Sequence, residues 1–342
     1  MDRLRDRHPD LRGLTGLHYI AYMGITEIAI DIIDMKRWDL NGRNFYGATP
    51  LIWAAKYGNF AFARLLLKQG DINPTFSDEL GLTPLMYAAK EGQDRVVNLL
   101  LERGDVDPDS SDKGGRTPLS YAAESGSKEV VKMLLERGDV NPDFSSKSGR
   151  APLSYAAGFG HEGLVKLLLE RGDVGPDTSN VHGRTPLPYA AGSGCENVMK
   201  IFLARRDVNP DSSSKSGRTP LSYAARSSRE GVVKMLLERR DVNPNSASKS
   251  GKTPRSYAAR SRHKGMIQML QGRKDVNPSF LDGDGRIPPS LVANVGRTSV
   301  VGLASEPKPL SHEISENFNA THEISVPTVC VQEEAESGSP SQ

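Results

Sequence analysis

Cysteine is nearly absent from this chain of 342 residues, which contains only Cys195 and Cys330. Two cysteines exclude a disulfide framework beyond one long-range bridge, and they do not stand at a metal-binding spacing. The first ten residues are charged rather than apolar, which is not typical of a secretory signal. These absences favour a reducing compartment, so we expect a protein of the cytoplasm or the nucleus that needs no metal or other cofactor.

Long apolar runs are also missing, because no stretch approaches the roughly 20 apolar residues that cross a bilayer. Neither sign of charge dominates, since 44 Lys and Arg stand against 42 Asp and Glu, for a net charge of +2. Basic residues are not interleaved with aromatic ones, as they are in many single-strand binders. We therefore expect no membrane partner, and the charge balance argues against a nucleic-acid partner.

What the sequence has in abundance is an internal repeat. The dipeptide Thr-Pro, or a relic of it, recurs every 34 residues, at positions 49, 83, 117, 151, 185, 219 and 253. One interval before Thr49 lies Thr15, which begins a weaker first unit. One interval after Thr253 lies Ile287, in what looks like a failed start. Such periods indicate a stack of similar units, so the repeat decides the fold.

The unit of residues 117–150 predicts two short helices joined by a turn. Thr117 followed by Pro118 is typical of a helix start, because the hydroxyl accepts from a free backbone N–H and proline fits the first helical position. Gly126 is expected to make the turn between the helices with a positive φ. Gly138 is expected to end the second helix with a left-handed backbone.

The rest of the unit predicts how neighbouring units stack. Apolar residues of the second helix share one face, namely Val130, Val131, Leu134 and Leu135. Residues 145–149 are polar and end in glycine, and we expect a short β-hairpin tip there. A helix pair this short cannot bury its apolar face alone, so several units must stack into one continuous core.

These residues closely resemble the ankyrin repeat. The family's Thr-Pro-Leu start is matched at Thr83, Thr117, Thr185 and Thr219, its inter-helix glycine at 58, 92, 126, 160 and 194, and its Asp-x-Asn turn at Asp139 and Asp207. The family's histidine after Thr-Pro-Leu is Ser120 or its equivalent here, which implies a weaker polar network. The segments GRTPLSYAA and LLERGDVNPD resemble those of ankyrin arrays in filamentous fungi.

The resemblance implies an all-α solenoid of helix-turn-helix units with short β-hairpin tips. It covers about residues 15–286, or eight repeats, after an N-terminal flank at 1–14. Residues 287–342 form a Ser- and Pro-containing tail with seven Glu and only one Arg and one Lys, which we expect to be disordered. Repeats 219–286 hold 14 basic and 6 acidic residues, so we hypothesise that the tail lies transiently on this basic end.

The pattern decays toward the C-terminal end. The inter-helix glycine becomes Ser228 and then Arg262, and the glycine after the second helix becomes Arg206, Arg240 and Lys274. If those positions keep a left-handed backbone, each costs about 1–3 kcal/mol. The core leucine of Thr-Pro-Leu becomes Arg255, whose charged head we expect to escape to solvent. The last repeat is either an end cap or a segment that orders on a partner.

The sequence shows no constellation of catalytic residues, so we expect no enzyme and no small-molecule substrate. His161, His263 and Cys195 stand before second helices, where polar residues cap. Arg-Gly-Asp occurs at 103, 137 and 171, but its glycine is accounted for by the helix end. We therefore read these residues as structural.

Two columns of residues are candidates for binding a partner. The first precedes Thr-Pro and consists of Arg116, Arg150, Arg184, Arg218 and Lys252, with Arg286 beyond them. It is either a solvated edge paired with aspartates such as Asp112 or a track for an acidic peptide. The second follows the Ala-Ala pair and includes Glu124, Arg226, Arg260 and the exposed aromatic candidate Phe159. A tyrosine in each first helix is expected to pack between repeats.

We therefore expect a monomeric adaptor or scaffold that binds another protein, one with an acidic segment if the first column is a track. The alternative is a regulatory or targeting array of an enzyme complex whose catalytic part is on another chain. Nucleic-acid binding through the basic end and a decayed copy without function are the remaining possibilities.

Overall fold

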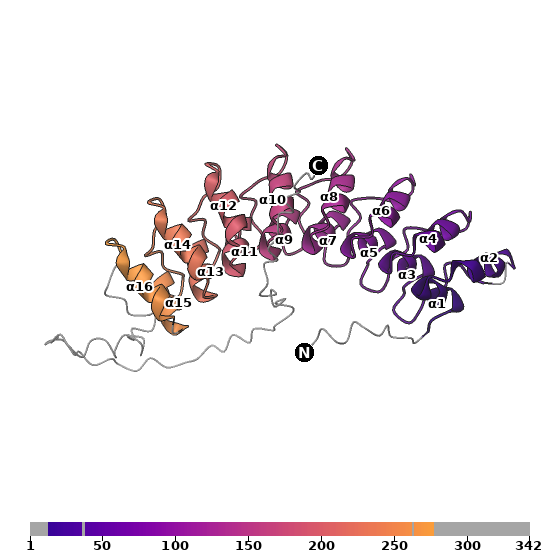
Figure 1. Cartoon of the computed structure of the whole chain (residues 1–342), viewed down its shortest axis with the longest axis horizontal. Helices are drawn as coiled ribbons and strands as arrows, with labels where there is room; N and C mark the ends of the chain where they lie inside the picture. The colour runs from indigo at the N-terminus through magenta and orange to yellow at the C-terminus, as the bar shows by residue number, and fades with distance from the viewer. Residues whose placement is uncertain (1–12, 36–37, 262, 277–342) are drawn as a thin grey trace, which may run out of the picture.

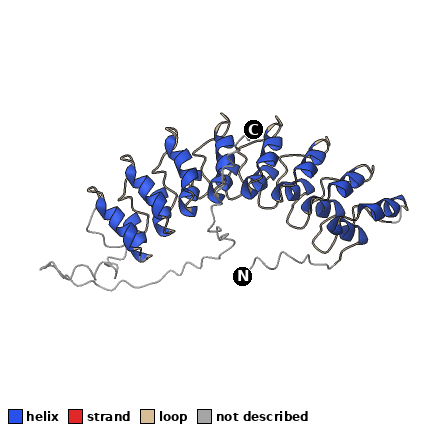
Figure 2. Ribbon diagram, in the orientation of Figure 1, coloured by secondary structure: helices blue, strands red, loops and turns tan. Residues whose placement is uncertain are grey.

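The computed structural model describes residues 13–35, 38–261 and 263–276. Within these ranges the chain forms sixteen α-helices and no strand, arranged in pairs along an arc (Figures 1 and 2). The first helix of each pair lies in the inner, concave row and the second in the outer row (Figure 1). The expected all-α solenoid is therefore confirmed, and it includes the weak first unit.

The inner row consists of α1 (Gly16–Met23), α3 (Pro50–Lys56), α5 (Pro84–Lys90), α7 (Pro118–Ser125), α9 (Pro152–Phe159), α11 (Pro186–Ser193), α13 (Pro220–Arg226) and α15 (Pro254–Arg260). The outer row consists of α2 (Thr26–Asp34), α4 (Phe60–Leu67), α6 (Asp94–Leu101), α8 (Lys128–Leu135), α10 (Glu162–Leu169), α12 (Glu196–Ala204), α14 (Glu230–Glu238) and α16 (Lys264–Gly272).

Thr-Pro starts the inner helices as predicted. In α3, α5, α7, α13 and α15 the threonine hydroxyl accepts from the backbone N–H three residues later, at 3.3–3.4 Å. The first unit starts with Thr15, where His18 keeps the family's network. Its Nδ1 accepts from the N–H of Thr15 at 3.2 Å, and its Nε2 lies 2.8 Å from the carbonyl oxygen of Ala48 in the next repeat.

Small residues let the inner helices approach one another closely. Ala122 and Ala123 of α7 have no exposed surface, and neither do Val131 and Leu134 of α8. The same pattern in every pair joins the units into one buried apolar core along the arc. This is the stacking that the short helices require, because no unit could bury its own apolar face.

The turn between the two helices has a left-handed residue, as expected. Gly126 has a φ of +85°, and in the eroded seventh repeat Ser228 has a φ of +62°. Among the described residues Ser228 is the sole non-glycine with a positive φ. A backbone cost is therefore expected at this position alone.

The expectation for the glycine after the outer helix was wrong. Gly138 does not have a positive φ, and neither do Arg206, Arg240 and Lys274, which replace the glycine in later repeats. The physical reason is that the outer helix ends without a left-handed cap, as α8 does at the right-handed Glu136. The replacements therefore cost no left-handed strain.

An arginine–aspartate fork follows each outer helix from α6 to α16. The series begins in the third repeat with Arg103. Its counterpart in the fourth repeat, Arg137, donates to both carboxylate oxygens of Asp139, at 2.9 and 2.7 Å. The Nη1 of Arg137 donates to the carbonyl oxygen of Leu101 in the preceding repeat, at 2.8 Å. The Arg-Gly-Asp tripeptide is thus a clamp between successive repeats, which explains its recurrence.

The tips are turns rather than the expected β-hairpins, since the described chain contains no strand. At the tip of the fourth repeat the N–H of Gly149 donates to the carbonyl of Ser146, at 2.6 Å. Neighbouring tips are joined by single backbone hydrogen bonds, such as that from Lys147 to Gly114 at 2.8 Å. One bond per step is too few to form a ladder.

The eighth repeat is folded through residue 276, with both of its helices present. The expectation that Arg255 escapes to solvent was wrong, because only 4% of this residue is exposed. It occupies the core-facing position that Leu221 holds in α13, and burial lowers its pKa. Arg262, residues 277–286 and the tail at 287–342 lie outside the described residues, as does most of the flank at 1–14.

Candidate functional site

The basic column before Thr-Pro lies among the tyrosines of the inner helices. The guanidinium carbon of Arg116 is 4.0 Å from the ring centre of Tyr121 in its own repeat and 4.7 Å from that of Tyr155 in the next. Arg150 is inserted in the same way, 4.1 Å from Tyr155 and 4.3 Å from Tyr189. Arginine and tyrosine therefore alternate along the inner row, in contacts that favour the charged guanidinium.

The alternation weakens toward the C-terminal repeats. Arg184 lies 5.2 Å from the ring of Tyr223. Arg218 donates from Nε to the hydroxyl of Tyr257 at 3.2 Å, and its guanidinium carbon is 5.9 Å from the ring centre. Lys252 continues the column as a half-buried side chain. All five candidates of the first column thus share one line along the inner row, as the repeat predicted.

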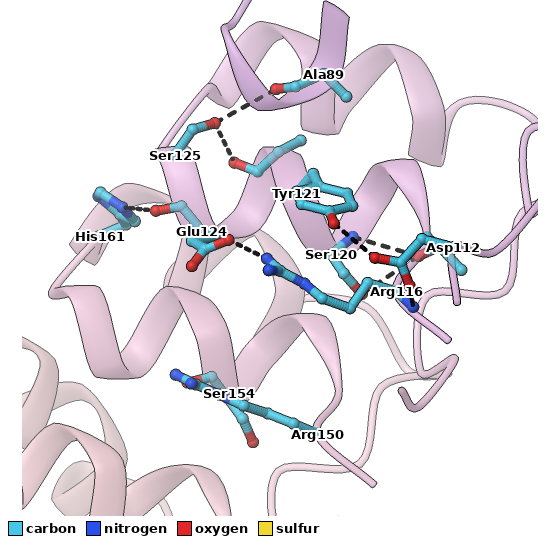
Figure 3. Close-up of polar contacts among 12 residues, drawn as sticks. Ala89, Asp112, Arg116, Ser120, Tyr121, Glu124, Ser125, Arg150, Ser154 and His161 are labelled. Carbon is cyan, nitrogen blue, oxygen red and sulfur yellow. Dashed lines mark hydrogen bonds and ion pairs between the residues drawn. The ribbon is translucent and has the colours of Figure 1, made fainter. Parts of the chain in front are cut away.

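The column is not an edge paired with aspartates, which was one of the two readings. Asp112 accepts instead from the hydroxyl of Tyr121 at 2.6 Å and from the backbone N–H of Arg116 at 2.8 Å (Figure 3). The carboxylate that pairs with the guanidinium of Arg116 belongs to Glu124, near the end of α7, the inner helix that follows Arg116. The two candidate columns therefore meet at this ion pair.

This ion pair is largely shielded, because the side chains of Arg116 and Glu124 are 19% and 18% exposed. Burial is the largest single influence on the pKa of Arg116 and acts to lower it, but the charge of Glu124, the hydrogen bond to it and the neighbouring tyrosines together raise the pKa. Burial lowers the pKa of Arg150, which forms no ion pair among the described residues, and the charge of Glu124 offsets this only in part. Arginine stays charged in either setting because its ordinary pKa is so high.

The second column changes character after Glu124. The next two repeats have Gly158 and Gly192 at this position, and the two after them have the exposed Arg226 and Arg260. Arg150 donates from Nη2 to the carbonyl oxygen of Ser154, at 3.0 Å. Within residues 13–276, as far as they are described, neither Arg150 nor Arg184 forms an ion pair, and the buried Nε atom of each has no hydrogen-bond partner.

The inner row therefore becomes basic along its length. Helices α9, α11, α13 and α15 carry no acidic side chain. Their exposed basic residues are Arg226 and Arg260, in line with Arg150, Arg184, Arg218 and Lys252 in the loops before them. An acidic segment of a partner would find complementary charge along this stretch.

Phe159 is half-buried rather than exposed, and its ring packs against the core. It lies parallel to the ring of His161, with 6.3 Å between the ring centres. His161 stands before α10 but does not cap it with its side chain, and its Nε2 contacts the carbonyl oxygen of Glu124 at 2.9 Å. His263 and the buried Cys195 also stand before outer helices without capping them.

Sequence reasoning placed the tyrosines in the packing between repeats, and they do lie there. It missed that Tyr155 and Tyr189 also hold the guanidinium groups of the candidate site. The signal is in the sequence, because each arginine of the column precedes a tyrosine by five residues in every repeat. Spacing alone does not show that the two side chains stack.

The described residues were found to contain neither a metal site nor a membrane-spanning helix. In the described ranges no group of His, Cys, Asp and Glu could hold a metal ion. No described helix is both long enough and apolar enough to cross a bilayer.

Comparison with known proteins agrees with the repeat. The family model described as ankyrin repeats in three copies matches residues 2–78, 71–143, 137–212 and 201–280. These matches overlap and together span most of the chain. A search of curated proteins gave no match.

Proposed function

Because this chain belongs to the ankyrin-repeat family, we propose that it is an adaptor or scaffold that binds a partner protein through its concave face and tips. Ankyrin repeats are in general protein-interaction modules, and stacked repeats present an extended curved surface for binding. The array of 15–286 supplies this surface, with the tail of 287–342 attached to it. We place the protein in the cytoplasm or the nucleus, acting as a monomer.

The observation that carries the proposal is the basic inner row from Arg150 to Arg260. The inner helices lie on the concave side of the arc (Figure 1), and α9, α11, α13 and α15 carry no acidic side chain that would neutralise these residues. The chain as a whole has a net charge of only +2, so the basic residues are concentrated rather than general. We infer that the partner offers an acidic segment to this face.

Affinity capture with the full chain tests the proposal. The variant Arg226→Glu/Arg260→Glu reverses two exposed charges of the inner row, and we expect it to lose the partner. The matched control Lys200→Glu/Lys234→Glu makes the same charge change on exposed residues of the outer helices α12 and α14. We expect this control to retain the partner. Loss by both variants, or by neither, would contradict binding through the inner row.

The identity of the captured protein also separates the two functions considered. A non-enzymatic partner joined to others favours a scaffold. An enzyme whose activity changes when the full chain is added favours a regulatory or targeting array.

A further inference from the structure

The ion pair between Arg116 and Glu124 shows that a guanidinium held between two tyrosines of the inner row can also bind a carboxylate. Glu124 stands eight residues after Arg116, near the end of α7, the inner helix that begins at Pro118. Its carboxylate reaches the edge of the guanidinium, while the tyrosine rings cover the faces. The fourth repeat thus contains a complete site for a carboxylate, filled by the protein's own side chain.

The next two repeats keep the arginine and lack the carboxylate. Gly158 stands eight residues after Arg150, and Gly192 stands eight residues after Arg184. A Cβ at Gly158 would lie 2.7 Å from Nη2 of Arg150, so the guanidinium lies against this glycine. A Cβ at Gly192 would meet nothing closer than 4.0 Å. In both repeats no side chain stands where Glu124 stands in the fourth, so neither Arg150 nor Arg184 has an internal carboxylate, and neither forms an ion pair among the described residues.

We propose that Arg150 with Gly158 and Arg184 with Gly192 form two adjacent carboxylate-binding sites, filled by two acidic side chains of one extended segment of the partner protein. This proposal rests on the proposed function and names the chemistry that the partner offers. In each site the partner's carboxylate takes the place that Glu124 takes beside Arg116. Glu124 reaches Arg116 through Nη2, so the partner's carboxylate is expected to pair with an Nη nitrogen of each arginine, in the charge-assisted hydrogen bond that guanidinium groups favour.

Stacking by tyrosine determines which ligands fit. The ring faces of Tyr155 and Tyr189 are covered by guanidinium groups, so they are not free to stack on the bases of a nucleic acid. The guanidinium groups match a carboxylate in charge and hydrogen-bond geometry. The exposed Arg226 and Arg260 lie further along the same row and attract an acidic segment over a longer range.

The repeat also determines the spacing of the two carboxylates. Packed helices lie about 8–10 Å apart, so successive sites along the inner row are separated by about that distance. A polyproline-type chain rises about 3.1 Å per residue with three residues per turn, so every third side chain shares a face at intervals of about 9 Å. Two acidic residues three apart in an extended segment therefore match Arg150 and Arg184.

The test uses the full chain and two dye-labelled peptides that contain Glu-Pro-Pro-Glu or Gln-Pro-Pro-Gln, with binding followed by fluorescence anisotropy. We expect the Glu peptide to bind and the Gln peptide to bind at least about tenfold more weakly. Gly192→Glu supplies an internal carboxylate to Arg184, and we expect it to weaken binding of the Glu peptide by about tenfold. Gly192→Gln, which has nearly the same size but no charge, should weaken binding clearly less than Gly192→Glu does.

A further variant opens a site instead of closing one. Glu124→Gln removes the internal carboxylate from Arg116, so a peptide with a third Glu at the same spacing should bind this variant more tightly than the natural protein. A cooperative thermal transition with a midpoint well above the assay temperature shows that each variant is folded, although Glu124→Gln should unfold at a somewhat lower temperature because it loses a shielded ion pair. Gly192→Glu should pass this check, because glutamate favours a helix more than glycine does.

Several results would overturn the assignment. Equal binding of the two peptides, or equal loss in Gly192→Glu and Gly192→Gln, would mean that no carboxylate is recognised here. If this occurs while Arg226→Glu/Arg260→Glu still loses the captured partner, the proposed function stands and these two sites do not.

The chain's own tail is tested as another occupant by changing Glu313, Glu316, Glu333 and Glu336 to glutamine in the full chain. Modest tightening of peptide binding is expected if the tail visits the basic face transiently. Peptide binding that appears only in this variant would assign the sites to the tail and overturn the assignment to a partner.

Discussion

The carboxylate of Asp109 accepts a hydrogen bond from the backbone N–H of Asn141, one repeat further along the chain, at 2.7 Å. Asp177 and Asp211 make the same bond to Asn209 and Asn243, at 2.8 and 2.7 Å. In each case the other carboxylate oxygen is buried, and among the described residues it has no hydrogen-bond partner. Burial is the main reason that the pKa of each of these three aspartates is raised.

These raised pKa values predict how stability changes with pH. A carboxyl group with a higher pKa in the folded state stabilises the fold when it is protonated. That contribution is complete below the unfolded-state pKa of about 4 and is lost as the pH rises through the raised folded-state value. We therefore expect the triple variant Asp109→Asn/Asp177→Asn/Asp211→Asn to become more stable relative to the natural protein between pH 4 and pH 7, measured by urea unfolding.

Asp173→Asn is a control of the opposite sign. Hydrogen bonding from Arg171 lowers the pKa of Asp173, so its contribution is present above the unfolded-state pKa and lost as the pH falls. This variant should become less stable relative to the natural protein as the pH rises toward the unfolded-state pKa of about 4, and the difference should stay nearly constant from about pH 5 to pH 7. A shift of both variants in one direction would contradict the assignment of the two classes of aspartate.

The arginine clamp predicts a loss of coupling between repeats. Arg171 donates to the carbonyl oxygen of Leu135 in the preceding repeat, at 3.2 Å. Arg171→Lys cannot make the fork to Asp173 and this bond together, and losing the bond to the carbonyl should cost about 1 kcal/mol. We expect a lower unfolding midpoint and a broader transition, because neighbouring repeats stabilise one another.

The control for the clamp is Lys166→Arg, one turn earlier on the exposed face of α10. This change keeps a basic group beside Glu162, with which Lys166 forms an exposed ion pair. Exposed pairs contribute little, so the unfolding curve should hardly change. An equal effect of both variants would show that the position of Arg171 between repeats is not what matters.

The boundaries of the repeats follow from local chemistry and could be read from the sequence. A threonine hydroxyl and a proline start a helix whatever lies around them, so α3, α5 and α13 begin at the residues expected. The line of arginines could be read for the same reason, because equal spacing places equivalent residues in register. The stacking of Arg150 between Tyr155 and Tyr189 could not be predicted from the sequence, because it depends on side-chain directions that two neighbouring repeats set together.

Two of the expectations that were wrong depended on non-local structure. Gly138 follows a helix, which is where a left-handed glycine is common, but here the arginine clamp follows a right-handed ending. Arg255 was expected to reach solvent, but its place on α15 faces the core. Neither the ending of α8 near Gly138 nor the burial of Arg255 could be predicted from the residue types alone.

Ser228 is expected to strain the seventh repeat. It has a φ of +62°, where the six preceding repeats have glycine, and a left-handed residue other than glycine costs roughly 1 kcal/mol. Ser228→Gly should raise the free energy of unfolding by about that amount, measured with urea. Ser227→Gly is the neighbouring control. Its φ is −91°, so glycine gains nothing there and should be neutral or destabilising.

Arg255→Leu should stabilise the eighth repeat. The equivalent positions of the other inner helices that begin with Thr-Pro or Ala-Pro hold leucine, and Leu153, Leu187 and Leu221 have no exposed surface. Arg255 is itself only 4% exposed, and burial lowers its pKa because the charged guanidinium is disfavoured there. Leucine removes the desolvation cost and adds apolar burial, so the free energy of unfolding should rise by roughly 1–3 kcal/mol.

Hydrogen exchange of α15 and α16 locates this gain. Protection should increase there and stay unchanged in α3 and α4, because distant repeats do not contact one another. Arg260→Leu is the matched control, with the same substitution at an exposed position of the same helix, and it should leave protection of α16 unchanged. If Arg255→Leu instead lowers the protection of α16, the buried guanidinium supports the last repeat through its polar contacts, and the stabilising effect of leucine is refuted.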